Sequence, residues 1–293
     1  MPELPEVETI VRDLRPHLVG RTIQSAKLSH DDVLRGVSKR KLVTALAGAR
    51  IIGMTRRAKH AILELHLTSS RHALKSRSSR PHVLTSSRLV IQPGMTGSLT
   101  IAEEPLTRGE AKYAVLRAPL DDGRELVYRD VRRLGTILLL DEKGWAAYDA
   151  ALGPEPLDPG LTPARFAAIM ASSKQAIKKV LMDQRKIVGV GNIYANEALF
   201  AAGIDPSKPA SLLTPRQNKL LLSHVRRILQ AAIDSQGTTF RDYRTGTGEK
   251  GNFQLELFVY GREGEKCRVC GTRLAHTHEI DARITVFCHR CQQ

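Results

Sequence analysis

Residues 174–200 read KQAIKKVLMDQRKIVGVGNIYANEALF, and this stretch predicts two helices separated by a glycine-rich turn. Gly189 and Gly191 would let backbone N–H groups approach an anion at the start of the second helix. We therefore expect a phosphate to dock between the two helices. A dinucleotide-binding loop is the competing interpretation, but no strand precedes the glycines and the third glycine of that fingerprint is absent. The basic residues expected on the first helix and the turn are Lys174, Lys178, Lys179, Arg185 and Lys186.

Helical patterns continue on both sides of this stretch. Apolar residues recur at three- and four-residue spacing in 165–171 and 220–237, and Thr214-Pro215 is typical of an N-cap followed by a first helical turn. Upstream, LGPEPLDPGLTP (152–163) holds four prolines and two glycines, which favours a hinge between domains.

The four cysteines of the chain all lie near its C-terminal end, as Cys267-x2-Cys270, seventeen residues, and Cys288-x2-Cys291. Each pair can hold a metal from a tight knuckle, and the intervening span suits a hairpin that brings the knuckles together. Two disulfides are the alternative, but they would need an oxidising compartment and there is no signal peptide. His276, His278 and His289 could replace a thiolate. Four thiolates would make a closed, structural Zn²⁺ site without an open position for catalysis.

The N-terminal half has a β pattern. Short runs with strand character occupy 61–67, 88–94, 125–130 and 135–140, and they are separated by turn signals such as Asp121-Asp122-Gly123. These runs predict a mostly antiparallel β-sandwich. Residues 68–88 hold seven serines and five lysines or arginines without an acidic residue, so we expect a solvated loop insertion, with an extra basic arm for nucleic acid as the alternative.

Overall charge indicates the kind of partner. The chain has 293 residues and a formal net charge of +15, which suits a polyanion such as nucleic acid. No apolar run is long enough to span a bilayer, and no lipidation motif is present. We expect a cytoplasmic, nucleoid-associated protein with no membrane partner.

The chain begins MPELPEVETIVRDL, with Pro2 directly after the start methionine. One interpretation is structural, because Pro2 and Pro5 can pre-set the first turn of a helix that Pro16 and Gly20 would end. The other is chemical. Removal of Met1 would leave a secondary amine on Pro2 that can attack a carbon and form a Schiff base, with the Glu3 carboxylate beside it to move protons.

These motifs occur together in a fixed order. MPELPEVET, RRAKHAILEL (56–65), PGMTGSL (93–99), DVRRLG (130–135), LGPEPL (152–157), residues 176–206 and the four-cysteine finger closely resemble bacterial formamidopyrimidine-DNA glycosylase. The resemblance covers nearly the whole chain except 68–88. It implies an α+β fold with two domains: an N-terminal β-sandwich with an N-terminal helix, and a C-terminal helix-two-turn-helix domain with a four-cysteine zinc finger. The expected ranges are 1–151 for the catalytic domain, 152–163 for the hinge, 164–258 for the helical domain and 259–293 for the finger.

The resemblance also implies roles for individual residues. It makes Pro2 the nucleophile that displaces the damaged base, Glu3 the proton-transfer group, and Lys59 and Arg283 phosphate contacts linked to strand cleavage by β,δ-elimination. The implied partner is damaged double-stranded DNA, bound by a monomer that flips the lesion out of the stack. The residues that would fill the void or bind the backbone are Met95, Arg132, Leu134, Lys174 and Asn192. The glycine-rich loop 244–253 adds Lys250, either as part of a loop that closes over a ligand or as a plain surface loop.

Three departures from the family pattern affect DNA contacts. Leu134 stands where the family usually has phenylalanine, Gln92 stands where it has histidine, and Tyr113 lies near another common histidine position. The implied function is excision of oxidised purines, such as 8-oxoguanine and formamidopyrimidines opposite cytosine, in base excision repair. Two alternatives remain: an endonuclease VIII-like glycosylase for oxidised pyrimidines, which Leu4 argues against, and a non-enzymatic zinc-finger protein that binds damaged DNA.

Overall fold

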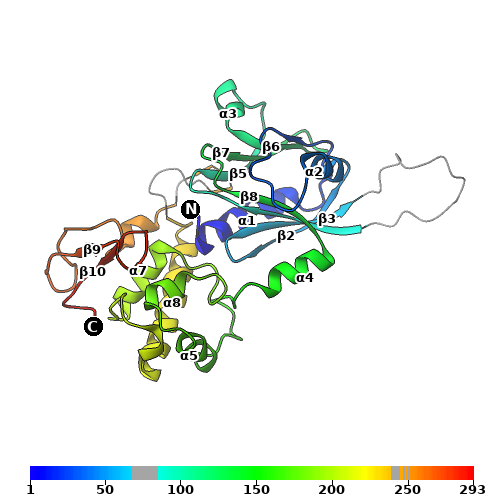
Figure 1. Cartoon of the computed structure of the whole chain (residues 1–293). Helices are drawn as coiled ribbons and strands as arrows, with labels where there is room; N and C mark the ends of the chain where they lie inside the picture. The colour runs from blue at the N-terminus through cyan, green and yellow to red at the C-terminus, as the bar shows by residue number, and fades with distance from the viewer. Residues whose placement is uncertain (68–84, 239–244, 247, 250) are drawn as a thin grey trace, which may run out of the picture. The chain divides into compact units, whose positions relative to one another are not determined.

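The computed structural model describes residues 1–67, 85–238, 245–246, 248–249 and 251–293 (Figure 1). The chain divides into two compact units. Unit 1 consists of Met1–Pro2, Glu6–Asp149 and Thr239–Gly251, and unit 2 consists of Glu3–Pro5, Ala150–Thr238 and Asn252–Gln293.

Unit 1 is built on two antiparallel four-stranded sheets (Figure 1). One has the order β2-β3-β4-β8, and the other has the order β1-β6-β7-β5. The four runs with strand character coincide with β3, β4, β7 and β8, so the predicted antiparallel β-sandwich is confirmed. The strands are β1 (Lys27–Leu28), β2 (Arg50–Arg57), β3 (His60–Leu67), β4 (Thr85–Gln92), β5 (Gly97–Ala102), β6 (Ala114–Pro119), β7 (Glu125–Asp130) and β8 (Thr136–Asp141).

The end of the expected insertion is ordered as part of a strand. Thr85–Arg88 begin β4, where Thr85 pairs with Leu67 of β3 and Ser87 pairs with Asp141 of β8. The expectation of a loop through residue 88 is therefore wrong at its C-terminal end. Pairing with β3 along the whole segment, and with β8 from Ser87 onward, provides partners for the backbone N–H and C=O groups in a strand. The rest of the insertion, 68–84, lies outside the described residues.

Helix α1 (Leu4–Leu18) supplies one side of the core of unit 1. Its buried side chains, spaced at three and four residues, pack with residues of both sheets. The helix continues two residues beyond Pro16, because a proline so near the end removes only one backbone donor. The α1 residues in this core are Val7, Ile10, Val11, Leu14 and Leu18.

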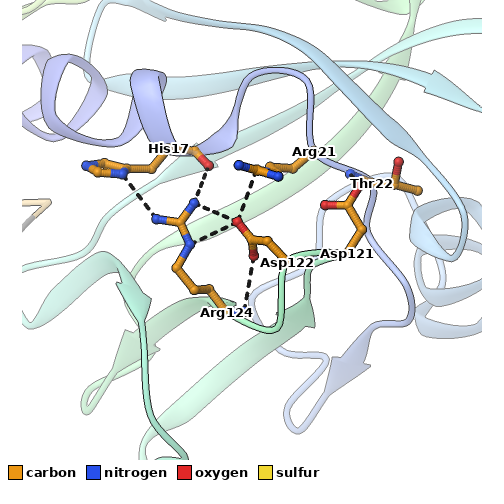
Figure 2. A network of polar contacts seen from close by, with 6 residues as sticks. All are labelled: His17, Arg21, Thr22, Asp121, Asp122 and Arg124. Carbon is orange, nitrogen blue, oxygen red and sulfur yellow. Dashed lines mark hydrogen bonds and ion pairs between the residues drawn. The ribbon is translucent and has the colours of Figure 1, made fainter.

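A polar network fixes the C-terminal end of α1 to the β6–β7 turn (Figure 2). Arg124 donates from Nη2 to the carbonyl of His17 at 3.1 Å and to the Asp122 carboxylate at 2.7 Å. Arg21 contacts the same carboxylate at 3.0 Å. The guanidinium thus satisfies a carbonyl that the helix end leaves without an intrahelical partner. The predicted Asp121-Asp122-Gly123 turn is confirmed, and it holds α1 in place.

The described part of unit 1 contains three further helices. Of these, α4 contacts the two inner strands of one sheet: its Tyr148 contacts His60 of β3, and Arg88 of β4 lies over its Trp145 ring at 5.3 Å. The helices are α2 (Lys39–Leu46), α3 (Arg108–Lys112) and α4 (Glu142–Ala150).

Unit 2 is a helical cluster around its own core. Thr214 forms a capping box with Gln217 at the start of α8, which confirms the predicted N-cap. Residues 151–162 contain no helix or strand, and Arg226 of α8 donates to three carbonyls of this segment at 2.8 Å. The elements are α5 (Pro163–Ala171), α6 (Ile177–Met182), α7 (Asn192–Ala201), η1 (Ala210–Leu212), α8 (Pro215–Asp234) and η2 (Phe253–Glu256).

The C-terminal end of unit 2 is a small hairpin, as predicted. Strand β9 (Ala275–Thr277) pairs with β10 (Thr285–Phe287), and Val286 packs in a small core with two of the cysteines. Among the helices that the structure describes, none combines the length and apolar character needed to cross a membrane.

Candidate active site and metal centre

The N-terminal proline is buried in unit 1, one residue after an exposed methionine. Met1 is 43% exposed, and its Sδ lies 3.6 Å from the Nε2 of Gln92, the last residue of β4. The side chain of Met1 therefore occupies space beside the Gln92 amide. Pro2 itself immediately precedes Glu3 and the first turn of α1.

Lys59 lies in the two-residue turn between β2 and β3. The cross-strand pair Arg57–His60 leaves Ala58 and Lys59 as the turn, and Ala58 adopts φ +55°. The Lys59 side chain is only 4% exposed, although lysine is almost never fully buried unless it is paired. The residue that ends this turn is therefore buried and not exposed to solvent.

Met95, Arg132 and Leu134 are exposed on two loops that Asp130 holds together. Asp130 accepts hydrogen bonds from Thr96 Oγ1 at 2.6 Å and from the backbone N–H of Gly135 at 2.8 Å. The Thr96 hydroxyl also accepts from the Arg132 N–H at 2.9 Å. The structure therefore brings together the β4–β5 and β7–β8 loops that carry the three predicted void-filling residues.

Asp130 and its partners were not among the residues singled out from the sequence. Its carboxylate is 1% exposed and also accepts from Tyr128 OH at 3.0 Å. Burial, with the Asp130 charge beside it, raises the pKa of the Tyr128 hydroxyl, so this group stays a donor. Gly135 has no room for a side chain, because a Cβ there would overlap the Tyr128 hydroxyl. The signal in the sequence is the acidic residue that ends a strand and begins the DVRR motif.

In unit 2, the Glu3 carboxylate occupies the N-terminus of α7. It accepts from the backbone N–H of Gly191 at 2.6 Å and of Ile193 at 3.0 Å, and it is 4% exposed. A Cβ at Gly191 would overlap this carboxylate. The Gly191 and Ile193 N–H groups and the positive end of the helix dipole therefore serve the Glu3 carboxylate, not a phosphate. A phosphate contact by Lys174 and Asn192 stays a prediction.

Lys178, one of the basic residues expected on the first helix, is fully buried. Its Nζ donates to the carbonyl of Ile284 at 2.9 Å and to Thr285 Oγ1 at 2.8 Å. Burial lowers the pKa of the ammonium to about 8. Its neighbour Lys179 and the predicted backbone contact Lys174 are both exposed. Lys174 precedes α6, which begins at Ile177.

Asn192 and Arg283 come together at the same segment of the finger. Asn192 Nδ2 donates to the Ile284 carbonyl at 3.1 Å, the same oxygen that Lys178 contacts. Arg283 is the preceding residue and its side chain is exposed. Unit 2 therefore places Asn192 at the start of α7 beside the segment that carries Arg283. Lys250, the remaining predicted DNA contact, lies outside the described residues.

Two residues of α7 that the sequence reasoning missed anchor the finger. Asn196 Oδ1 accepts from the Val286 N–H at 2.8 Å. The Glu197 carboxylate accepts from the N–H groups of Phe258, Val259 and Tyr260 at 2.8–2.9 Å. Burial raises the pKa of Glu197, although these bonds oppose the shift. The available signal was two polar residues within an otherwise apolar helix.

The four cysteines form one compact group that fits a metal. Their Sγ atoms all lie within 4.8 Å of one another, with Cys270 and Cys288 at 3.4 Å and Cys267 and Cys291 at 4.0 Å. Four thiolates about 2.3 Å from a tetrahedral Zn²⁺ would be separated by roughly 3.8 Å, so the arrangement fits the ion. No histidine belongs to the group, and all four positions would be filled by protein. The predicted structural zinc site is confirmed.

Two family models together match most of the chain. The model described as the formamidopyrimidine-DNA glycosylase N-terminal domain matches residues 1–137, and the model for the H2TH domain of the same enzyme matches residues 152–244.

Full-length relatives and solved structures agree with these matches. The formamidopyrimidine-DNA glycosylases of Stutzerimonas stutzeri and Cronobacter sakazakii are 40% and 41% identical to the chain. Each alignment covers 100% of this chain and 100% of the relative. A Lactococcus lactis Fpg mutant, solved in complex with Fapy-dG-containing DNA, superposes with a TM-score of 0.85 at 31% identity and covers 100% of both chains. The MutM (Fpg) protein of Thermus thermophilus superposes with a TM-score of 0.81 at 32% identity, covering 99% of this chain and 98% of that one.

Proposed function

Because the chain belongs to the formamidopyrimidine-DNA glycosylase family, and is thus a DNA glycosylase and abasic-site lyase for oxidised purines, we propose that Pro2 is its nucleophile. Removal of Met1 frees the secondary amine. The amine forms a bond to C1′ of the damaged nucleotide as the bond between C1′ and the base breaks, and the base leaves with that electron pair and takes up a proton.

The attached amine loses its N–H proton, and its lone pair then opens the sugar ring: the C1′–O4′ bond breaks, O4′ takes up a proton, and a C1′=N⁺ iminium forms. Strand cleavage follows from this iminium. The C1′=N⁺ group acidifies the C2′ proton, whose loss expels the 3′ phosphate from C3′. A second elimination then expels the 5′ phosphate. Glu3 moves protons to and from the sugar. The support for this role is the anchoring of its carboxylate by Gly191 and Ile193, which holds the residue next to Pro2 in one position. This anchoring is the observation that carries the proposal.

We assign the filling of the gap left by the flipped base to the two loops that Asp130 joins. A base that is flipped out leaves a gap in the stack, at a cost of a few kcal/mol. Met95, Arg132 and Leu134 are exposed on adjoining loops, so they can enter the gap together. Leu134, which is 52% exposed, provides an apolar wedge without an aromatic ring.

Phosphate contacts fall to basic and amide side chains of both units. In unit 1 we assign Lys59, and in unit 2 we assign Lys174, Asn192 and Arg283, with Lys250 as a further contact from the glycine-rich loop. The net charge of +15 supports this assignment. The zinc, when bound, supplies only structural rigidity: it would hold the β9–β10 hairpin, and Asn192 of α7 would contact that hairpin at Ile284, directly before β10.

The substrate we propose is duplex DNA that carries 8-oxoguanine or a formamidopyrimidine opposite cytosine. The L. lactis relative has been solved with Fapy-dG-containing DNA and also with DNA that contains an oxidised pyrimidine. A lesion panel should therefore include an oxidised pyrimidine as the second candidate substrate. We also infer that the protein acts as a monomer in the cytoplasm, because one chain supplies all the assigned residues and its zinc thiolates need a reducing compartment.

Borohydride trapping tests the proposal directly. Protein with a verified Pro2 terminus is incubated with 8-oxoguanine duplex and with abasic duplex, and a form that retains Met1 is the matched control. We expect a covalent protein–DNA adduct only from the Pro2-terminated form. An adduct of equal yield from the Met1-retaining form would assign the nucleophile to another amine, with Lys59 as the first to test.

A further inference from the structure

His60, Gln92 and Tyr148 form a hydrogen-bonded group beside the N-terminus in unit 1. His60 begins β3 directly after Lys59 and is 6% exposed. Its Nδ1 lies 3.1 Å from the Arg57 carbonyl, and its Nε2 lies 2.9 Å from Tyr148 OH and 3.2 Å from Gln92 Oε1. The other end of the Gln92 amide faces the Met1 side chain.

The donors and acceptors in this group are consistent in only two ways. A carbonyl can only accept, so Nδ1 of His60 carries a proton. If the ring is neutral, Nε2 is then an acceptor, and the Tyr148 hydroxyl can donate to it. The Gln92 oxygen, also an acceptor, would then face the Nε2 lone pair without a proton between them. The amide must therefore turn its NH2 toward His60 and its oxygen toward the N-terminus. If the ring is protonated, Nε2 is a donor, and the Gln92 oxygen faces it.

The two amide orientations have the same shape, so hydrogen bonding decides between them. The surrounding groups favour the neutral ring at neutral pH. Burial lowers the pKa of His60, and the charges of Lys59 and Arg57 lower it further, against the two hydrogen bonds that raise it. Burial also raises the pKa of Tyr148, which keeps its hydroxyl a donor. The carboxylate on this side, Asp149 of α4, is paired with Arg57 at 2.6 Å.

We propose that His60 is a positioning residue that sets which end of the Gln92 amide faces the N-terminal amine. The inference rests on the proposed function, in which Met1 is removed and Pro2 attacks. With neutral His60, the Gln92 oxygen accepts the N–H of the Pro2 amine and leaves its single lone pair for C1′. With protonated His60, the Gln92 NH2 donates to that lone pair and blocks it.

This switch predicts an unusual pH dependence. The Pro2 amine must itself be deprotonated to attack, which alone gives a tenfold loss of rate per pH unit on the acid side. When His60 must also be neutral, the losses multiply. The single-turnover rate of Schiff-base formation should therefore fall about 100-fold per pH unit at pH values below the pKa of His60.

The test is a pH series of single-turnover trapping on an abasic duplex, which separates the amine chemistry from base excision. We expect the wild type to show the 100-fold slope and His60→Phe to show the tenfold slope, since phenylalanine keeps a ring and cannot titrate. His66→Phe, on the same strand, should keep the wild-type slope. Gln92→Met, which has no amide to turn, should also show the tenfold slope, so the proposal stays testable if His60→Phe does not fold.

Wild-type trapping at pH 8 reports on the Pro2 nucleophile separately from the slopes. Absence of any adduct there would overturn the proposed function. An adduct with a tenfold slope in the wild type, or with a 100-fold slope that persists in His60→Phe and Gln92→Met, would overturn the role of His60 while the nucleophile stands.

Discussion

The buried ammonium of Lys178 should make the stability of this protein rise with pH. Burial lowers its pKa from 10.5 to about 8, with Arg283 lowering it further and with Asp281 and Glu3 opposing the shift. Between these two pKa values the folded state has lost the proton and the unfolded state still binds it. The unfolded state therefore holds more protons, so the free energy of unfolding increases as pH rises through this interval.

The size of this effect follows from the two pKa values. At pH 7 both states are protonated and the contribution is near zero, whereas at pH 9.5 the folded lysine is almost fully neutral. The difference between these pH values is about 2 kcal/mol, from the linkage relation with one proton. Replacement by methionine keeps the volume and removes the titration. The Ile284 carbonyl would keep the Asn192 amide as a partner.

Urea denaturation of zinc-loaded wild type, Lys178→Met and Lys179→Met at pH 7 and pH 9.5 measures the effect. Lys179 is the exposed neighbour on the same helix, so its variant controls for the loss of one charge. We expect the wild type and Lys179→Met to gain about 2 kcal/mol more than Lys178→Met between the two pH values. An equal pH response in all three proteins would refute the assignment of a lowered pKa to Lys178.

Four further substitutions test other parts of the structure. Gly191→Ala should lower the free energy of unfolding by about 2 kcal/mol, because its Cβ overlaps the Glu3 carboxylate; an unchanged urea midpoint would contradict that contact. Thr214→Ala removes the capping box of α8 and should cost about 1 kcal/mol in the same assay, and a loss below the error of the measurement would mean that the cap is not formed. Leu134→Phe should tighten binding of a lesion duplex roughly threefold to tenfold, equivalent to about 1 kcal/mol of added stacking, with unchanged binding of abasic single strands; equal Kd values for both proteins on the duplex would argue against a wedge at this position. Cys288→Ser should lose zinc and weaken DNA binding, which metal analysis and fluorescence anisotropy measure, and retention of one tightly held zinc per chain would contradict a four-thiolate site.

Adjacent loops illustrate how the candidate site depends on buried polar groups. Asp130 is only 1% exposed and so does not contact DNA itself. Its carboxylate nevertheless joins the loops that carry Met95 and Leu134. Glu197 has a comparable position in unit 2, where its carboxylate holds the segment that leads into the finger. Both carboxylates are satisfied by several donors, as a buried charge requires.

The sequence by itself determined the features that depend on neighbouring residues. The spacing of the cysteines identified the metal site, and short runs with strand character between turn signals located β3, β4, β7 and β8. Thr214-Pro215 located the start of α8 in the same way. Each of these signals acts over a few residues, because side-chain spacing, turn chemistry and capping are local properties of the chain. The ordered motifs then identified the family.

Only the tertiary structure decided how chemically similar residues differ. Lys178 and Lys179 are adjacent and identical in type, but one is buried against Ile284 and the other is exposed. The anion at the start of α7 is Glu3, which lies 188 residues before Gly191 in the sequence. Local propensity cannot encode such pairs, because which distant group fills a helix end or neutralises a buried charge depends on how the chain closes on itself. The sequence therefore shows which residues are charged, and the tertiary structure determines which groups these residues contact.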